Sequence, residues 1–484
     1  MIRSSLVMAL VVFGGSSQAF AGGFEIPENT TKAVARGGTG AASKSDPSAI
    51  YFNPALLSRA RGLQILVDVN LVDLAVEFQR DPLVVGSTTR DFDPISNGAG
   101  IFPAPFLAAS YDFGIDGFGA GIGIFGPSAY GKRCFGDPDN ECADDDRNSA
   151  RLMMLESDIV QVYFAAGASY EFKLGNSGSL AIGAAAALSW QRTNFTVVVD
   201  ELLVSPPFNE DPENQAPLKA TNLQDFQPTA FVGLAYFNGP LTFGLSYRPP
   251  LAWSVDGKMS LDLPDSLKDL AVLEGDGLVF ETDMAGSLRA GVDYAYGEHP
   301  GVEGAPLFDV EFNFVWEDWS RVDFFKIKPQ ASLNVAGVGQ PLFDVYQPKH
   351  WNDTYSFRLG GSVGLFPWLT GHAGGSYETA AQDESMTNVD FVSWDRITGG
   401  AGATIHATKW LDVDLGYSYT YSADRTVTNG AVYQQIPMSG CVGPDFDADA
   451  CAVPGTPPGN PQNNGEWSSS FQIISIGTTF KFDP

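Results

Sequence analysis

The sequence has few histidines and few basic residues, and these shortages exclude several classes of function. Its 484 residues include 4 histidines, and 28 lysines and arginines stand against 57 acidic residues, for a net charge of −29. A chain this acidic is a poor partner for nucleic acid and for other anionic phosphate surfaces. It has no His-Glu-x-x-His motif and no nucleotide or cofactor motif. We therefore expect no enzyme, no cofactor, no metal site and no nucleic-acid partner. The enzymatic alternative is a barrel lipase that uses a serine with His372 or His406.

Long apolar runs are also missing once the N-terminal leader is set aside. A membrane-spanning helix needs ~20 consecutive apolar residues, and the chain beyond residue 21 has no such run. Residues 1–21 combine a basic Arg3, an apolar core and small residues at Ala19 and Ala21, which is typical of a secretory signal peptide. We expect cleavage after Ala21 and export of a chain without helical spans.

Strict alternation of apolar and polar residues takes the place of such runs. From Leu411 to Tyr421, Leu, Val and Tyr occupy one parity and Asp, Gly, Ser and Thr the other. Successive strand residues point to opposite faces, so such a segment has one apolar and one polar face. About 14 segments are predicted to be strands, and many reach the ~10 residues that cross a bilayer at a tilt. They are Leu63–Phe78, Gly100–Phe113, Gly117–Phe125, Ser157–Lys173, Ser179–Val199, Phe226–Phe237, Pro240–Lys258, Glu281–Tyr296, Leu307–Ile327, Asp353–Phe366, Trp368–Thr379, Trp394–His406, Trp410–Ala423 and Ser468–Phe482.

The connections between these segments alternate in length. Short turns such as Asn238-Gly239 alternate with long loops such as Asp424–Trp467. Aromatic residues gather near strand ends on the apolar parity and fit membrane-interface girdles, with ordinary β-propensity as the alternative; they are Trp253, Tyr294, Tyr296, Tyr417, Tyr419, Tyr421, Phe480 and Phe482. An even strand number, short turns at one end and long loops at the other are typical of outer-membrane barrels. We therefore predict an all-β fold, a transmembrane antiparallel β-barrel of about 14 strands over residues 63–484, which leaves no sheet edge unpaired in the membrane.

The segment before the first strand, residues 22–62, is rich in glycine and in turn-forming residues. Asp46-Pro47 and Asn53-Pro54 each place a capping side chain before a proline suited to the first helical position. This predicts two short helical turns in a compact segment that fills the barrel interior as a hatch. Asp46, Pro47, Asn53, Pro54 and Ala55 form the hatch motif.

The four cysteines form two local pairs, Cys134 with Cys142 and Cys441 with Cys451, each within one long loop. In an exported chain this favours two disulfides that staple the loops, although two other connectivities exist. Neither pair has the spacing of a thiolate metal site. The acidic run Asp137–Asp146 is interpreted as a solvated loop, with calcium binding as the alternative.

The third predicted strand is unusually rich in glycine and is followed by proline. The residues concerned are Gly119, Gly121, Gly123, Gly126 and Pro127. Glycine weakens a strand interior, and proline donates no ladder hydrogen bond. Our hypothesis is that this strand interrupts barrel pairing and opens a lateral exit. The alternative is a strand packed tightly against the hatch.

Two further groups are candidates for ligand contact. Parity assigns Arg248, Arg289, Arg358 and Arg396 to the lumen, where they either pair with lumen acids and anchor the hatch or bind a ligand carboxylate. Leu263, Leu267 and Leu270 follow helical spacing over Leu263–Glu274. They predict an amphipathic helix in an outer loop, which either packs on its neighbour or forms a groove where a hydrophobic ligand first lands.

Several motifs together resemble the FadL/TodX family of outer-membrane transporters. They are Asn53-Pro54-Ala55 in the hatch, the element Trp316–Asp323 with its Trp-x-x-Trp-Ser-Arg pattern, Arg358-Leu359-Gly360-Gly361, Trp394-Asp395-Arg396 and the closing segment Gly465–Phe482. The resemblance spans the whole mature chain. It departs from the family at Asn388–Ser393, where an Ile-Pro-Asp element is usual, and at Asp483-Pro484, which extends beyond the usual aromatic end.

The resemblance implies passive uptake of long-chain fatty acids or other hydrophobic molecules across the outer membrane. Ligand would land on apolar outer loops, be held at the hatch and leave sideways beside the third strand. It places Phe24 and Ile26 near a lumen pocket. Phe231 and Val315 are wall candidates for a mostly apolar ligand pocket, and hatch packing alone is the alternative for each of these residues. The expected partners are hydrophobic small molecules, outer-membrane lipids and lipopolysaccharide, and we expect a monomer. A general porin and a structural or adhesive surface barrel are the alternatives.

Overall fold

The computed structural model describes most of the chain from Asn29 onward. The described residues are 29–43, 45–126, 131–137, 139, 142–199, 210–342, 344–433 and 461–482. The predicted signal peptide lies outside them, as do Phe24, Ile26, Pro127, Cys441 and Cys451. No helix among the described residues is long and apolar enough to cross a membrane.

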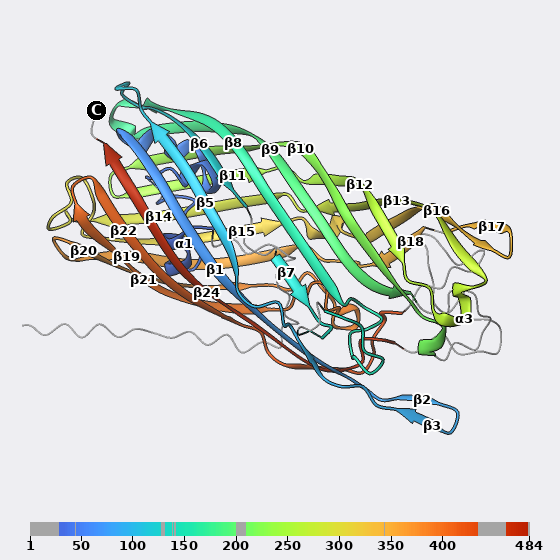
Figure 1. The fold of residues 1–484 in the computed structure, drawn as a ribbon. Helices are drawn as coiled ribbons and strands as arrows, with labels where there is room; N and C mark the ends of the chain where they lie inside the picture. The colour runs from blue at the N-terminus through green and yellow to red at the C-terminus, as the bar shows by residue number, and fades with distance from the viewer. Residues whose placement is uncertain are drawn as a thin grey trace, which may run out of the picture.

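The described strands form one closed antiparallel barrel that crosses from end to end 14 times (Figure 1). We call each crossing a stave, whether it is one continuous strand or several strands in line. Several staves consist of two or three strands in line, so the sheet contains 22 strands. The last strand pairs with the first from Leu63↔Phe482 to Arg80↔Gly465, which closes the barrel. The prediction of an all-β barrel with about 14 strands is confirmed.

The staves follow chain order around the barrel. They are β1 (Leu63–Arg80); β4 (Ile95–Ser96) with β5 (Phe102–Tyr111); β6 (Phe118–Phe125) with β7 (Gly131–Cys134); β8 (Glu156–Lys173); β9 (Ser179–Val199); β10 (Ala216–Asn238); β11 (Leu241–Arg248) with β12 (Leu251–Leu261); β13 (Ala271–Met284) with β14 (Ser287–Tyr296); β15 (Phe308–Glu317) with β16 (Phe324–Val335); β17 (Val338–Pro341), β18 (Val345–Pro348) and β19 (Thr354–Phe366); β20 (Leu369–Glu378); β21 (Arg396–Thr408); β22 (Leu411–Tyr421) with β23 (Arg425–Val427); and β24 (Gly465–Phe482). The hairpin of β2 (Leu83–Val85) and β3 (Thr88–Arg90) projects from the long-loop end (Figure 1).

The outer surface of the barrel is apolar, as the alternation predicts. In β22 the parity of Leu415, Tyr417 and Tyr419 is exposed, while Asp414, Ser418 and Thr420 are buried. Tyr294, Tyr296, Tyr421 and Phe482 are likewise exposed near strand ends. This pattern places apolar side chains toward lipid and polar ones toward the lumen.

The strands at the long-loop end are longer than predicted. β10 begins at Ala216 and β13 at Ala271, each about ten residues earlier than the alternation suggested. β7, β17, β18 and β23 occupy segments assigned to loops. The helix expected over Leu263–Glu274 is reduced to α3 (Asp265–Lys268), because the residues from Ala271 join β13. The barrel wall therefore continues at the long-loop end into segments whose apolar and polar residues do not alternate clearly in the sequence.

Four neighbouring staves are broken at a similar level, and the break between β11 and β12 shows how the parity that faces inward can change. Burial in β11 falls on Ser246 and Arg248, but after Pro249-Pro250 it falls on Leu251 and Trp253. The interpretation of Trp253 as a membrane-interface residue is therefore wrong, since its side chain is buried in the lumen. Prolines lack a ladder N–H, so a strand that stops at them can resume in the opposite phase.

The N-terminal segment, residues 29–62, lies inside the barrel near the short-turn end (Figure 1). It contains α1 (Thr31–Ala35), α2 (Ala49–Phe52) and the 3₁₀-helix η1 (Pro54–Arg59). The Asn53 side chain caps η1 by accepting from the Ala55 N–H at 3.1 Å, and Pro54 takes the first helical position. The Asp46 carboxylate accepts from the Ser48 N–H at 3.0 Å just before α2. The two predicted helical turns are present; α1 was not foreseen.

Candidate functional site

An apolar cavity of about 140 Å³ lies in the outer half of the barrel, between the N-terminal segment and the long loops. Inward-facing residues of β8, β9, β10, β13 and β16 form its walls, and segments around Met153 and Phe391 close it. The lining includes Met153, Met154, Ile159, Phe195, Val197, Leu218, Phe280, Met284, Phe325, Ile327 and Phe391. No charged side chain is among the described residues that line it.

The cavity is apolar because the inward-facing side chains change from polar to apolar toward the long-loop ends of the strands. On β9 the inward parity runs from Ser189 and Gln191 through Thr193 to Phe195. Toward the outer end the same parity supplies aromatic and aliphatic side chains, and Phe195 contacts Phe280 with ring centroids 5.8 Å apart. A few polar groups in a mainly apolar pocket are what a small-molecule site requires.

Two loops hold the outer side of the cavity in place. Phe391 is fixed next to a buried ion pair between Lys349 and Asp390, and the Lys349 ammonium lies 4.5 Å from the Phe325 ring centroid. Burial lowers the pKa of Lys349, against the attraction of Asp390. The pair is fully enclosed, so loss of one partner would leave an uncompensated charge.

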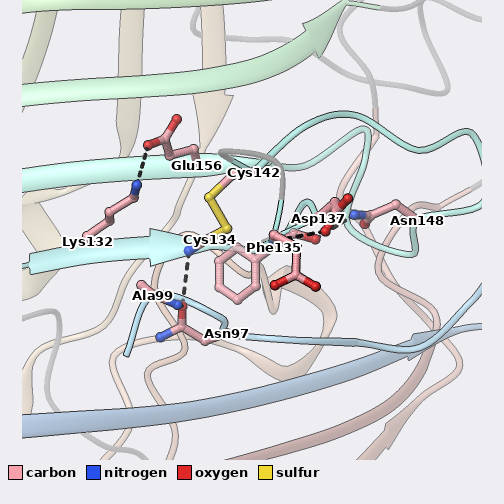
Figure 2. The surroundings of a disulfide bond; sticks show 10 residues. Asn97, Ala99, Lys132, Cys134, Phe135, Asp137, Cys142, Asn148 and Glu156 are labelled. Carbon is pink, nitrogen blue, oxygen red and sulfur yellow. Dashed lines mark hydrogen bonds and ion pairs between the residues drawn. A yellow bond between two sulfur atoms is a disulfide. The ribbon is translucent and has the colours of Figure 1, made fainter. Parts of the chain in front are cut away.

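The loop after β7 is held by a disulfide. Cys134 at the end of β7 is bonded to Cys142, and the Cys134 N–H donates to Asn97 Oδ1 at 3.0 Å (Figure 2). The predicted pairing of Cys134 with Cys142 is confirmed. Met153 and Met154, later in this loop, reach the cavity. The acidic run is partly outside the described residues; Asp144 and Asp146 pair with Arg151, and no described group of acids could hold a metal ion.

A second, smaller pocket lies where the N-terminal segment meets the wall. It is lined by Tyr51, Phe231, Ser246, Tyr247, Arg248, Ser287 and Arg289. Three predicted site residues, Phe231, Arg248 and Arg289, thus come together around Tyr51. Arg289 Nη2 donates to the Tyr51 hydroxyl at 2.8 Å, and its guanidinium lies 4.4 Å from the Tyr51 ring centroid. Phe231 packs on Tyr51 with ring centroids 6.0 Å apart.

The other two lumen arginines belong to the wall network. Arg358 Nη2 pairs with Glu378 at 3.2 Å and its Nη1 donates to the Gly38 carbonyl at 3.3 Å. Arg396 pairs with the other oxygen of Glu378. Both therefore satisfy a buried acid, as the anchoring interpretation predicts. Arg289 differs, because it has no carboxylate within ion-pair distance among the described residues, and its Nη1 has no partner there.

Two cations of α1 and its C-terminal end tie the N-terminal segment to acidic wall residues. Arg36 lies 2.5 Å from Asp309 and 3.4 Å from Glu311. Lys32 lies 3.5 Å from Asp46 and 3.9 Å from Asp414. Burial alone would lower the pKa of the Lys32 ammonium, but Asp414 and Asp46 raise it overall, so the ammonium stays charged. Backbone amides add to these anchors, since the N–H groups of Gly40 and Ala42 donate to Glu311 at 3.2 and 2.8 Å.

Gly119, Gly121 and Gly123 of the third stave face the N-terminal segment, and Gly126 faces β8. A Cβ at Gly119 would lie 2.0 Å from the Leu57 carbonyl oxygen, and one at Gly121 would lie 3.1 Å from the Leu57 side chain. A Cβ at Gly123 would lie 2.9 Å from the Phe125 ring, and one at Gly126 would lie 2.4 Å from the Gln161 carbonyl oxygen. The glycines therefore allow η1 and β8 to approach β6 closely, as the packing alternative predicts.

The β5 strand beside this stave contains two prolines. The described ladder between β5 and β6 ends at Phe106↔Phe125, and β7 pairs with β8. Pro103 and Pro105 of β5 have no backbone N–H group for a ladder hydrogen bond. The Phe102 ring lies against the backbone of Gly131.

The remaining predicted residues lie away from the cavity. Leu263, Leu267 and Leu270 lie around α3 at the tip of the long-loop end, where Ser266 Oγ donates to the Glu213 carbonyl at 3.1 Å. Val315 is buried on β15 but lines none of the described pockets. In the Trp-x-x-Trp-Ser-Arg element, Trp319 Nε1 donates to Glu317 at 2.9 Å and Trp316 Nε1 to Asp353 at 3.0 Å. This element closes the break between β15 and β16.

The sequence pattern missed the cavity itself. Part of its wall comes from the outer parts of β10 and β13, which the sequence analysis assigned to loops. Another part comes from β16, which the sequence analysis did not separate from β15. A signal was present in the inward parity of Ile159, Phe195 and Phe280, which is apolar where a water-filled lumen would be polar.

A serine and a histidine do meet in the lumen. Ser362 Oγ lies 2.9 Å from His372 Nδ1, and the sequence Gly360-Gly361-Ser362-Val363-Gly364 has the spacing of a nucleophile elbow. It lies within the regular strand β19, however, and not on a strand-to-helix turn. Arg36 donates to the same oxygen, and no described pocket reaches it. The contact belongs to the anchoring network.

Residues 12–453 match the family model described as outer membrane protein transport protein (OMPP1/FadL/TodX). The chain belongs to this family. It is therefore a transport protein of the bacterial outer membrane and not an enzyme. Outer membrane protein P1 of Haemophilus influenzae is 24% identical over 444 residues, which cover 86% of this chain and 89% of the relative.

Solved structures of this FadL/TodX fold superpose over nearly the whole chain. A Pseudomonas aeruginosa FadL homologue is 15% identical with a TM-score of 0.71, covering 95% of this chain and 100% of the homologue. The Pseudomonas putida toluene transporter TodX is 14% identical with a TM-score of 0.64, covering 95% and 100%. The Ralstonia pickettii toluene transporter TbuX is 16% identical with a TM-score of 0.60, covering 94% and 99%. At these identities the likeness establishes the fold.

Proposed function

We propose that this FadL/TodX family member takes up small hydrophobic molecules across the outer membrane and that the apolar cavity is their binding site. The single observation that carries the proposal is the composition of the cavity, whose described lining is aromatic, aliphatic or uncharged polar. Burying apolar surface there favours a hydrophobic solute over a hydrated one. The ligand's own gradient and its preference for an apolar environment drive this passive transport.

The size of the cavity favours a compact ligand. Its volume of about 140 Å³ is close to that of an engineered dry cavity of roughly 150 Å³ that binds benzene. A single aromatic ring therefore fits without rearrangement. A long-chain fatty acid would extend from the cavity toward the smaller pocket, where Arg289 could bind its carboxylate.

Filling the cavity tests the proposal. Ile159 faces the cavity from β8, whereas Ile182 on β9 is exposed on the lipid-facing surface. We expect Ile159→Trp to lower toluene affinity and uptake at least tenfold, because the indole occupies the ring's place. Ile182→Trp, the matched control, should behave like wild type. Equal toluene binding by both variants would remove the cavity from the account.

Release is proposed to occur sideways between β5 and the third stave. The support is the absence of an N–H group in Pro103 and Pro105 of β5 and the glycines of β6, since both weaken a strand ladder. The Phe102 ring lies against Gly131 where the two staves meet. The N-terminal segment, residues 29–43 and 45–62, lies across the axial route, so lateral passage avoids moving it.

Shortening Phe102 tests this route. Phe102→Ala removes the ring that contacts Gly131 between the two staves and should speed transfer of bound ligand from the barrel into a surrounding lipid nanodisc. Phe172→Ala removes a ring exposed on the outer face of β8 and serves as the matched control. A transfer rate in Phe102→Ala that equals both wild type and control would place the exit elsewhere.

A further inference from the structure

A groove with a volume of about 740 Å³ is hollowed into the lipid-facing surface of the barrel. It crosses β1, β5, β6, β8 and β9, which belong to five neighbouring staves (Figure 1). Fifteen described residues line it, and none of them has a polar side chain. We call it the lipid-facing groove. It is separate from the apolar cavity inside the barrel, with which it shares no described lining residue.

Strand register produces this groove. Outward side chains that stand opposite one another on successive staves form rows across the wall. One row contains three alanines; it runs through Ile65, Ala109, Ile122, Ala166 and Ala186. The next row toward the long-loop end is bulky, and its side chains are at least 40% exposed; it runs through Val67, Leu107, Ile124, Phe164 and Leu188. The alanines therefore form a floor, and the bulky row forms a wall beside it.

The groove begins at the periplasmic head-group level. Ile65 lies near the start of β1 and stands opposite Phe480, whose ring stacks on the exposed Trp410 with centroids 6.5 Å apart. Aromatic girdles mark the membrane interfaces of outer-membrane barrels, and short turns mark the periplasmic side. Ala186, at the other end of the row, lies seven residues beyond the start of β9, against two for Ile65 in β1. The row therefore descends obliquely into the hydrocarbon, by roughly 17 Å along the tilted strands.

The size and position of the groove favour one acyl chain over a second copy of the protein. Five strands at a spacing of ~4.8 Å span about 19 Å, which is comparable with one leaflet's half of the ~30 Å hydrocarbon core. An interface between two copies needs about 20–30 residues on each side, whereas fifteen described residues line the groove. The groove is also continuous with the apolar surface of the barrel, so membrane lipid reaches it directly.

We propose that the lipid-facing groove binds one acyl chain of a phospholipid from the periplasmic leaflet. The chain lies along the floor of Ala109, Ala166 and Ala186 and packs sideways against the bulky row. A straight chain gains close contacts along its length there, whereas methyl branches hold a chain away from the floor. The inference goes beyond the proposed function and does not rest on it, because chain binding requires neither the cavity nor transport.

Two phospholipids with the same head group test the proposal. Dipalmitoyl and diphytanoyl phosphatidylethanolamine both have chains with 16 carbons in line, but the phytanoyl chains carry methyl branches. Native mass spectrometry of the full barrel in detergent measures the affinity for the first bound lipid. We expect wild type to bind the dipalmitoyl lipid about tenfold more tightly, the difference that roughly two buried methylenes make. Equal affinity for the two lipids would overturn the proposal without any variant.

Filling the floor sharpens the test. Ala166→Phe places a ring in the row and should weaken binding of the dipalmitoyl lipid about tenfold, which removes the preference over the diphytanoyl lipid. Ala401→Phe is the matched control, because Ala401 is exposed on β21, opposite Tyr417, and does not line the groove. It should keep the wild-type preference. Heat-modifiable electrophoretic mobility identifies any variant whose barrel has not folded; the two lipids on wild type then decide.

Two further outcomes would contradict the proposal. A wild-type preference that persists in folded Ala166→Phe would place the bound chain elsewhere on the barrel. A dimer in the wild-type spectra that Ala166→Phe abolishes, with no preference between the lipids, would assign this face to a second copy of the protein. Neither outcome affects the proposed uptake, since no transported molecule is present in the experiment.

Discussion

The inner and outer halves of the barrel use opposite chemistry. The inner half is filled by the N-terminal segment, which charged wall residues such as Asp309 and Glu311 hold through Arg36. The outer half is partly empty and is lined by apolar side chains such as Phe195, Phe280 and Phe325. Charged contacts fix one arrangement because unpairing them in a buried site is costly, whereas apolar walls accept any ligand of suitable size. We therefore propose that the inner half closes the barrel and that the outer half captures the ligand.

The largest expected effect comes from removing the Arg36 anchor. Arg36→Met leaves Asp309 and Glu311 buried without their cation, at a cost of about 3–5 kcal/mol. We expect the N-terminal segment to unseat and ion conductance in planar bilayers to rise. Arg61→Met is the matched control, because the pair of Arg61 with Asp116 is exposed and contributes little. A silent Arg36→Met barrel with wild-type thermal stability would refute the anchoring role.

Close packing between the third stave and η1 gives the next effect. Gly119→Ala places a Cβ 2.0 Å from the Leu57 carbonyl oxygen, so the backbone must move, which costs roughly 1–3 kcal/mol. Gly121→Ala meets only the end of the Leu57 side chain at 3.1 Å and should cost less. Thermal unfolding of the two variants checks the order. If Gly121→Ala is the more destabilised, the packing of η1 on β6 is not as described.

The smallest effect concerns the stapled loop of the outer half. Cys142→Ser releases the loop that carries Met153 and Met154 to the cavity. Ordering it on binding then adds about 0.5–1 kcal/mol, so toluene affinity should fall roughly two- to fivefold. Reduced wild-type protein provides the comparison and should show the same loss. An unchanged affinity in both would mean that the loop does not support the cavity.

The sequence predicted the fold well because each strand was read from its own alternation. β9 was predicted at its observed bounds, Ser179–Val199, since burial on one face is a local property of a strand. Asn53-Pro54 likewise predicted the start of η1, because capping acts within a few residues.

Features that depend on several staves could not be derived in the same way. The phase change at Pro249-Pro250 reverses the faces of β12, and only the ladder reveals it. The four lumen arginines look equivalent in sequence, yet Arg358 and Arg396 share Glu378 while Arg289 has no carboxylate partner among the described residues. Which acid stands opposite a given arginine is set by strand register, which a single sequence does not specify.

The most direct test of the account is to locate a bound ligand. Crystals of the folded barrel grown with 4-bromotoluene allow the bromine to be placed by anomalous scattering. The account predicts a bromine peak inside the outer-half cavity, within van der Waals distance of Phe195 or Phe280. Bromine found only outside that cavity, for example around Leu267 and Leu270 near α3, would contradict it.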